Sequence, residues 1–153
     1  MSTAFENVRS TPRQWWRGLS VEQKVAVLFT INAFINWTTA VRGIIDPVGM
    51  ASTFRFDHPP EEYTFVVRLW ASFVFMFGCM FWEVSRDVRR KAALVKYNWI
   101  EKTLTAGAVT FGFLVGEAPI RLMMLILLTN WAWIPPLLYL DRRLQRSIHS
   151  EGR

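Results

Sequence analysis

Four long apolar segments, separated by polar or charged stretches, dominate the pattern of this sequence. They cover residues 25–45, 63–82, 103–116 and 120–140. A helix needs about 20 apolar residues to cross the roughly 30 Å hydrocarbon core of a bilayer. Three segments reach that length, whereas the third has only fourteen uncharged residues. We expect the third span to begin near residue 99. It then crosses the bilayer either with Glu101 and Lys102 at the interface and Lys102 reaching toward water, or where the bilayer thins locally.

This pattern predicts an all-α integral membrane protein, an antiparallel bundle of four transmembrane helices with an N-terminal interfacial amphipathic helix. Residues 1–19 form the tail and interfacial helix, 20–146 the membrane domain, and 147–153 a second tail. The predicted spans are about 25–45, 63–82, 99–116 and 120–140. A short re-entrant hairpin in place of the third and fourth spans is the alternative. The segment between the first two spans, residues 46–60, shows no period and is expected to be irregular.

Local signals predict where helices begin and bend. Pro12 follows Thr11, as at a helix start. Ser20 with Gln23 fits a capping box that opens the first span. Pro135 removes a backbone donor and should kink the fourth span.

Composition and charge agree with a membrane protein. Hydrophobic residues make up 52% of the chain, aromatic residues 15% and charged residues only 20%. Fourteen of the eighteen Lys and Arg residues lie before the first span, between the second and third, or after the fourth. The positive-inside rule therefore predicts that both termini are cytoplasmic, which requires an even number of spans. The first twenty residues lack a signal-peptide core, so we expect the first span to be retained.

The formal charge of +6 is interpreted as attraction to anionic headgroups rather than to nucleic acid. The basic stretch after the second span, residues 85–102, is expected to lie as a helix on the cytoplasmic surface. No nucleic-acid partner is predicted.

Several cofactor classes have no candidate ligands in this sequence. Cys79 is the one cysteine, and the two histidines, His58 and His149, lie outside the spans. With these span limits no lysine is central in a span, so no retinal-type linkage is expected. We predict no catalytic residue, no metal site and no cofactor. Whether the protein is an enzyme stays open, with the balance toward a non-enzyme.

Polar residues follow one face of the first span. Asn32, Asn36, Thr39 and Gly43 are spaced by four, three and four residues, and Asn130 lies near the middle of the fourth span. Because lipid cannot satisfy an asparagine, this face should turn inward. Two interpretations stay open: interhelical hydrogen bonds that hold the bundle together, or a polar pocket for a ligand.

Charged residues gather toward the other end of the spans. They are Arg42, Asp46, Arg68, Glu117 and Arg121. They would form an ion-pair network or a site for an anionic headgroup or carboxylate. In the third span, Ala108, Gly112 and Gly116 form a small-residue stripe that should pack against another span or another protein.

Four short features together resemble the DoxX-like group of small bacterial membrane proteins. They are GIIDPVG at residues 43–49, RDVRRK at 86–91, the Glu101–Lys102 pair, and YLDRRL at 139–144. The resemblance covers about residues 21–146. It implies a bacterial inner membrane and a protein partner or homo-oligomer more often than an isolated enzyme.

Two functions follow from these observations. In the first, the chain is a non-enzymatic accessory or structural subunit of a larger membrane complex. In the alternative, it binds or converts a lipid-like or hydrophobic small molecule, with the three asparagines as polar anchors and the arginines as an anion clamp.

Overall fold

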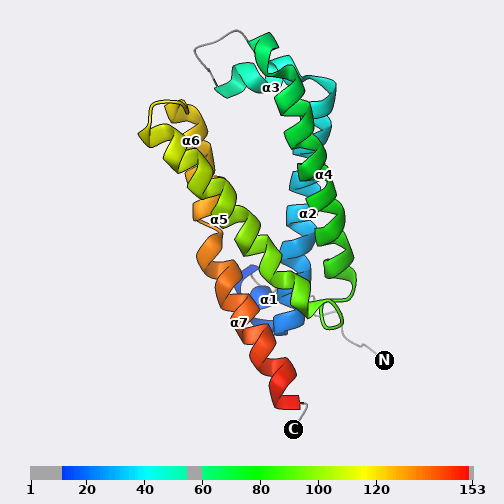
Figure 1. The fold of residues 1–153 in the computed structure, drawn as a ribbon. Coiled ribbons are helices and arrows are strands. Elements are labelled where there is room, and N and C mark those ends of the chain that lie inside the picture. The colour runs from blue at the N-terminus through cyan, green and yellow to red at the C-terminus, as the bar shows by residue number, and fades with distance from the viewer. Residues whose placement is uncertain (1–11, 55–59, 152–153) are drawn as a thin grey trace, which may run out of the picture.

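The computed structural model describes residues 12–54 and 60–151, and the elements in those ranges are all helical, without a strand. The predicted all-α fold class is therefore confirmed. Thr11 and the ends of both predicted tails lie outside the described residues. In chain order the elements are α1 (Pro12–Gly18), α2 (Val21–Ile45), α3 (Pro47–Phe54), the 3₁₀ turn η1 (Pro60–Tyr63), α4 (Thr64–Arg86), α5 (Ala92–Leu114), α6 (Ile120–Ile126), the π-helical turn η2 (Leu127–Trp131) and α7 (Ile134–Glu151) (Figure 1).

Among the described residues, three helical segments are long and apolar enough to cross a membrane. They cover Val21–Ile45, Glu61–Arg86 and Ile120–Ser150. Helix α5 has 23 residues and a length of about 35 Å at 1.5 Å per residue. It differs from the other three because a charged pair, Glu101 and Lys102, lies near its middle.

Helices α2 and α4 form the closest pair. The predicted capping box opens α2: the Gln23 amide donates to Ser20 Oγ, and the Ser20 amide donates to Gln23 Oε1. Small residues let the two backbones approach. Ala33, Gly43 and Ala71 are buried there, and a Cβ added at Gly43 would lie 2.9 Å from Ala71 Cβ.

Gly78→Leu should destabilise the α2–α4 pair. A Cβ at Gly78 would lie 2.6 Å from Trp37 Cδ1 and 3.3 Å from the Ala33 carbonyl oxygen. Such overpacking costs about 1–3 kcal/mol of unfolding free energy. Thermal unfolding in detergent measures the loss. Gly107→Leu is the control, since no atom of the described residues lies within 4 Å of its added Cβ. Equal unfolding midpoints for Gly78→Leu and Gly107→Leu would show that α2 and α4 do not approach each other closely at Gly78.

The hydrophobic core lies toward the end of the molecule where α4 leads into α5. Its fully buried members include Phe29 from α2, Phe81 from α4 and Leu144 from α7. The rings of Phe29 and Phe81 meet edge to face with centroids 5.4 Å apart. All four long helical segments therefore share this end of the bundle.

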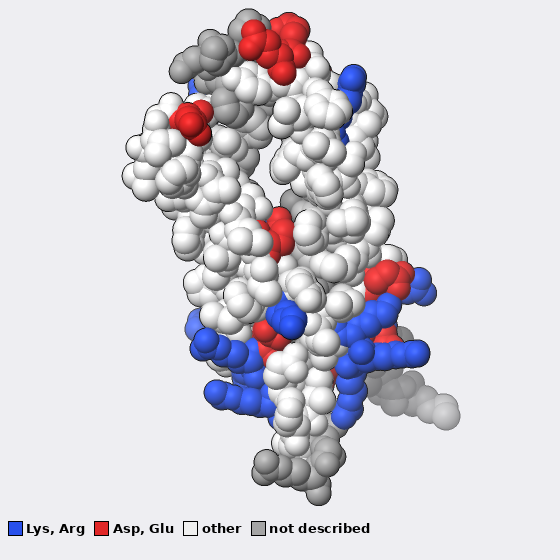
Figure 2. Space-filling view, in the orientation of Figure 1, with Lys and Arg blue, Asp and Glu red and all other residues white. Residues whose placement is uncertain are grey.

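At the opposite end the bundle divides into two arms. One arm holds α2, α3 and α4, and the other holds α5 and α6 (Figure 1). The space-filling view shows a hollow between them (Figure 2). The same view shows Lys and Arg gathered at the core end, below a broad belt that is uncharged on this face except for an acidic patch between the arms.

The expectation of a separate surface helix over residues 85–102 is wrong, because residues 92–102 belong to the same helix as residues 103–114. Only five residues, Asp87–Lys91, connect α4 to α5, and α5 begins at Ala92. This region is helical and packed because Ala92, Val95 and Asn98 bury one face of α5. Two bonds anchor it to α7: Gln145 Nε2 donates to the Ala92 carbonyl at 3.1 Å, and Trp99 Nε1 donates to Asp141 Oδ2 at 3.0 Å.

The expectation of an irregular segment after α2 is also wrong for residues 47–54, which form α3. Asp46 Oδ1 accepts the Gly49 amide at 2.9 Å, and Pro47 occupies the first helical position. Arg42 Nη2 donates to Thr53 Oγ1 at 3.1 Å and ties α3 to α2. Residues 55–59 lie outside the described part.

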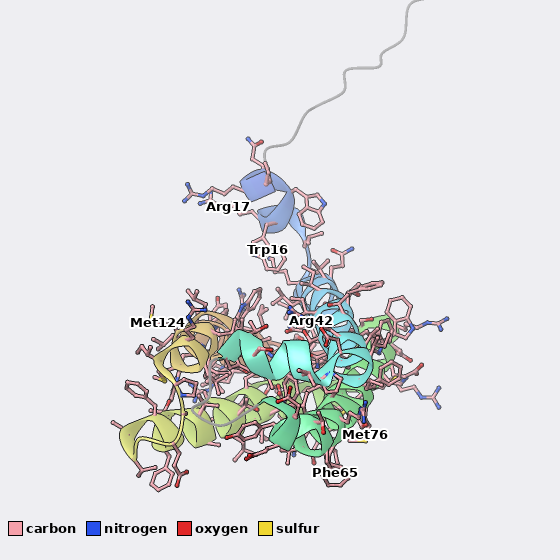
Figure 3. All side chains as sticks on the ribbon, turned by 90° about the horizontal axis from the view of Figure 1, so that it is seen from above. Trp16, Arg17, Arg42, Phe65, Met76 and Met124 are labelled. Atoms are coloured by element: carbon pink, nitrogen blue, oxygen red, sulfur yellow. The ribbon has the colours of Figure 1, made fainter. Side chains whose placement is uncertain are left out.

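Helix α1 begins at Pro12, as predicted. Seen along the bundle, it extends sideways from α2, whereas Phe65 and Met76 mark the outer surface of α4 (Figure 3). This sideways direction fits a helix that lies in the plane of a membrane surface.

Candidate functional site

A polar cavity lies between the two arms, next to the core. Its volume is about 220 Å³. Side chains from α2, α4, α5, α6 and η2 line it, and Phe54 of α3 contributes at one side. The polar lining residues are Asn32, Asn36, Thr39, Glu101, Lys102, Thr105, Thr129 and Asn130. The structure thus brings the three asparagines predicted as site residues to one cavity.

Glu101 and Lys102 place an ion pair in this lining. Lys102 Nζ lies 3.6 Å from Glu101 Oε2, which is longer than a hydrogen bond. Lys102 is only 6% exposed, and Glu101 Oε2 is buried without a hydrogen-bond partner among the described residues. Glu101 Oε1 has a long contact of 3.4 Å from Thr105 Oγ1. Both charged groups therefore retain hydrogen-bonding capacity toward the cavity.

The position of Lys102 overturns two expectations. Its side chain does not reach toward water as expected, because Lys102 is only 6% exposed and lies near the middle of the 23-residue helix α5. A lysine is therefore central in a long helix after all. The sequence did not indicate Glu101 and Lys102 as site residues because the charged residues before residue 103 were expected to lie outside the apolar part of the span. The signal was the spacing of Asn98, Lys102 and Thr105, which lie four and three residues apart and share one helical face.

Asn36 is the least satisfied of the three asparagines. It is 8% exposed and lines the cavity, and its amide has no partner among the described residues. Asn32 Nδ2 donates to the Leu28 carbonyl of its own helix at 3.0 Å, and Asn130 Nδ2 donates to Thr129 Oγ1 at 3.0 Å. In the described part of the chain, no hydrogen bond joins the asparagines across helices. Their side chains line the cavity instead.

A break in the fourth helical segment positions Asn130. The predicted disturbance near Pro135 is confirmed: α6 passes into η2 at Leu127, and α7 starts only at Ile134. The Ala132 amide donates to the Leu127 carbonyl five residues back, as in a π-turn. Pro135 and Pro136 bring no amide hydrogen to this region. The widened turn directs Asn130 and Trp133 to the cavity.

Asn98 is a further unsatisfied polar residue, one turn along α5 from Lys102. It is fully buried, and neither Nδ2 nor Oδ1 has a partner among the described residues. Buried polar atoms in proteins are normally paired with protein or with ordered water. The polar face of α5 therefore continues from the cavity toward the core.

The structure does not bring together the five charged residues expected at the other end. Arg42, Asp46 and Arg68 belong to the arm of α2 and α4, whereas Glu117 and Arg121 flank the turn between α5 and α6. All five are exposed, and within the described ranges no ion pair joins them. Arg42 and Asp46 instead hold α3.

The small-residue stripe of α5 faces outward in this chain. Ala108 and Gly116 are exposed, and the nearest foreign atom to a Cβ at Gly112 is Ala118 Cβ at 3.4 Å, in the following turn. Gly116 itself has φ of +81°, which favours glycine at the end of α5. Packing of this stripe against another protein stays a prediction.

No group of three His, Cys, Asp or Glu side chains suited to a metal is present in the described ranges. Comparisons with models of known protein families, with curated proteins and with solved structures found no match. The cavity itself offers an ammonium, a carboxylate, amides and hydroxyls between apolar walls. This combination suits hydrogen bonding to a small polar group.

Proposed function

We propose that this protein is an integral membrane protein whose four long helical segments all cross the bilayer, with α5 as the fourth span. The two arms would shelter the charges of α5 from lipid. Membrane-embedded ionisable residues are costly and normally face a bundle interior or a wet cavity, which agrees with the burial of Lys102. The gathering of Lys and Arg at the core end supports a cytoplasmic location for that end (Figure 2).

We further propose that the cavity binds the polar head of a small amphipathic molecule taken from the membrane. The observation that carries this is Asn36, a residue nine-tenths buried whose amide has no partner among the described residues, beside an incompletely satisfied ion pair. Asn36 and Lys102 would donate to oxygen atoms of the head, while Glu101 would accept from a hydroxyl or amine. Because the ion pair is neutral as a whole, an uncharged head fits it best.

Size argues for an amphipathic rather than a fully enclosed ligand. Pockets for drug-sized ligands measure about 300–1,000 Å³. This cavity is smaller, at about 220 Å³. A head of that size would fit, and an apolar tail would extend into the hollow between the arms (Figure 2).

Small-molecule binding was the alternative function from the sequence, and the cavity favours it over an accessory subunit. The subunit hypothesis, the DoxX-like resemblance and a bacterial inner membrane stay predictions. No feature of the described chain identifies a chemical conversion, so the proposal is binding.

Native mass spectrometry of the protein extracted gently from membranes tests the proposal. The wild type should carry a small-molecule adduct at 1:1 stoichiometry, and Asn36→Leu should lose it, because the leucine cannot hydrogen-bond to the head. Thr38→Val is the matched control: Thr38 lies two residues along α2, is exposed, and bonds its own helix at the Phe34 carbonyl. Adduct retained by Asn36→Leu, or lost equally by both variants, would refute a site at Asn36.

A further inference from the structure

A second recess, separate from the polar cavity, lies where α1 and the start of α2 meet α7. Its volume is about 390 Å³. Three basic residues line it, Arg17 from α1, Lys24 from α2 and Arg143 from α7, and none of the described lining residues is acidic. The remaining wall is aromatic and aliphatic, with Trp16, Trp133 and Leu28 among its members. We name this recess the basic groove.

We infer that the basic groove holds one anionic phospholipid of the leaflet on the basic side, with its phosphate among Arg17, Lys24 and Arg143. This inference rests on the proposed membrane insertion but not on a ligand in the polar cavity. The argument comes from charge complementarity and from the position of the groove.

Charge is the first support. Among the described residues, none of the three basic side chains has a carboxylate partner. Arg143 Nη1 donates to Tyr139 Oη at 3.2 Å, and its guanidinium lies 5.7 Å from the centre of that ring. These contacts orient the guanidinium without neutralising it. Arginine binds phosphate oxygens through two parallel hydrogen bonds, so an oriented, unpaired guanidinium suits a headgroup.

Position is the second support. The groove lies at the end of the molecule where Lys and Arg gather, the end that would meet anionic headgroups (Figure 2). Helix α1 extends sideways from the bundle there, and Trp16 packs against the core (Figure 3). Leu28 and Trp133 then supply an apolar wall leading away from the charges. A molecule with a negatively charged head and apolar chains matches a groove that is basic at one part and apolar at the next.

Lipid titration by native mass spectrometry of the full chain in detergent tests the inference. We expect one phosphatidylglycerol to bind about 100-fold more tightly than phosphatidylcholine, since each basic residue near an anionic surface contributes about fivefold. The triple variant Arg17→Gln/Lys24→Gln/Arg143→Gln should bind the two lipids alike. The control Arg90→Gln/Arg142→Gln/Arg146→Gln removes three exposed charges outside the groove and should keep the preference.

Equal binding of both lipids by the wild type, or equal loss in the two triple variants, would overturn the inference. Equal binding by the wild type would mean that the protein has no lipid-selective site. Equal loss in the two triple variants would mean that anionic lipid is attracted to the net charge of the protein alone. The same spectra separate this result from the proposed function. The groove variant should keep the small-molecule adduct of the polar cavity, and Asn36→Leu should keep the phosphatidylglycerol preference. A wild-type protein that binds neither lipid would also overturn it.

Discussion

Lys102→Met should lower the free energy of unfolding by about 3–5 kcal/mol, because the carboxylate of Glu101 would stay buried without its cation. The two groups lie 3.6 Å apart, and Lys102 is among the most buried polar residues of the chain. Methionine keeps the length and apolar stem of lysine, so the change removes charge with little change in volume. Unfolding in mixed detergent micelles measures the loss.

Two further variants make this result specific. Glu101→Gln/Lys102→Met removes both charges and should recover much of the lost stability, since no unpaired charge remains. Lys96→Met removes an exposed charge from the same helix and should change stability by at most about 1 kcal/mol. If Lys102→Met were as stable as Lys96→Met, the ion pair would be exposed to water and the cavity would not be sheltered.

Phe81→Ala should cost a similar amount, about 3–5 kcal/mol, for a different reason. Phe81 is fully buried and packs edge to face on Phe29, so its removal leaves a void that the helices cannot fill. Phe65→Ala on the same helix is the control, because Phe65 is 74% exposed. Chemical unfolding of both variants would check the core. A larger loss for Phe65→Ala would mean that α4 is rotated about its axis.

The helices with continuous apolar sequence could be predicted closely, because hydrophobicity alone defines them. The first predicted span, 25–45, ends where α2 ends, at Ile45, and the capping box at Ser20 and Gln23 sets its start. The fourth segment was predicted to be disturbed near Pro135, since proline has no amide hydrogen to donate.

Helix α5 could not be predicted as well, because charged residues interrupt its hydrophobic signal. Taken one at a time, these charged residues indicate a solvent-exposed stretch; they are Lys96, Glu101 and Lys102. In the structure Lys96 is exposed while Lys102 is buried, and only their helical register separates them. Burial of Lys102 depends on Glu101 and on residues of other helices, which local sequence does not reveal.

Only part of the candidate site could be predicted from the sequence, because contacts between helices are not visible in local spacing. Helical spacing indicated that Asn32 and Asn36 share a face of α2, and the structure places both in one cavity with Asn130. The charges near the opposite end were expected to meet because antiparallel helices end together. They do not meet because the two arms diverge there, and divergence depends on packing between distant segments (Figure 1).

Photo-crosslinking from inside the cavity tests the central claim most directly. A photoreactive diazirine residue at position 122 replaces Leu122, which lines the cavity, and one at position 128 replaces Leu128, which is 69% exposed. After irradiation in membranes, position 122 should capture one small amphipathic molecule that position 128 does not, while position 128 captures bulk phospholipid. Bulk phospholipid at both positions would contradict a selective site between the arms.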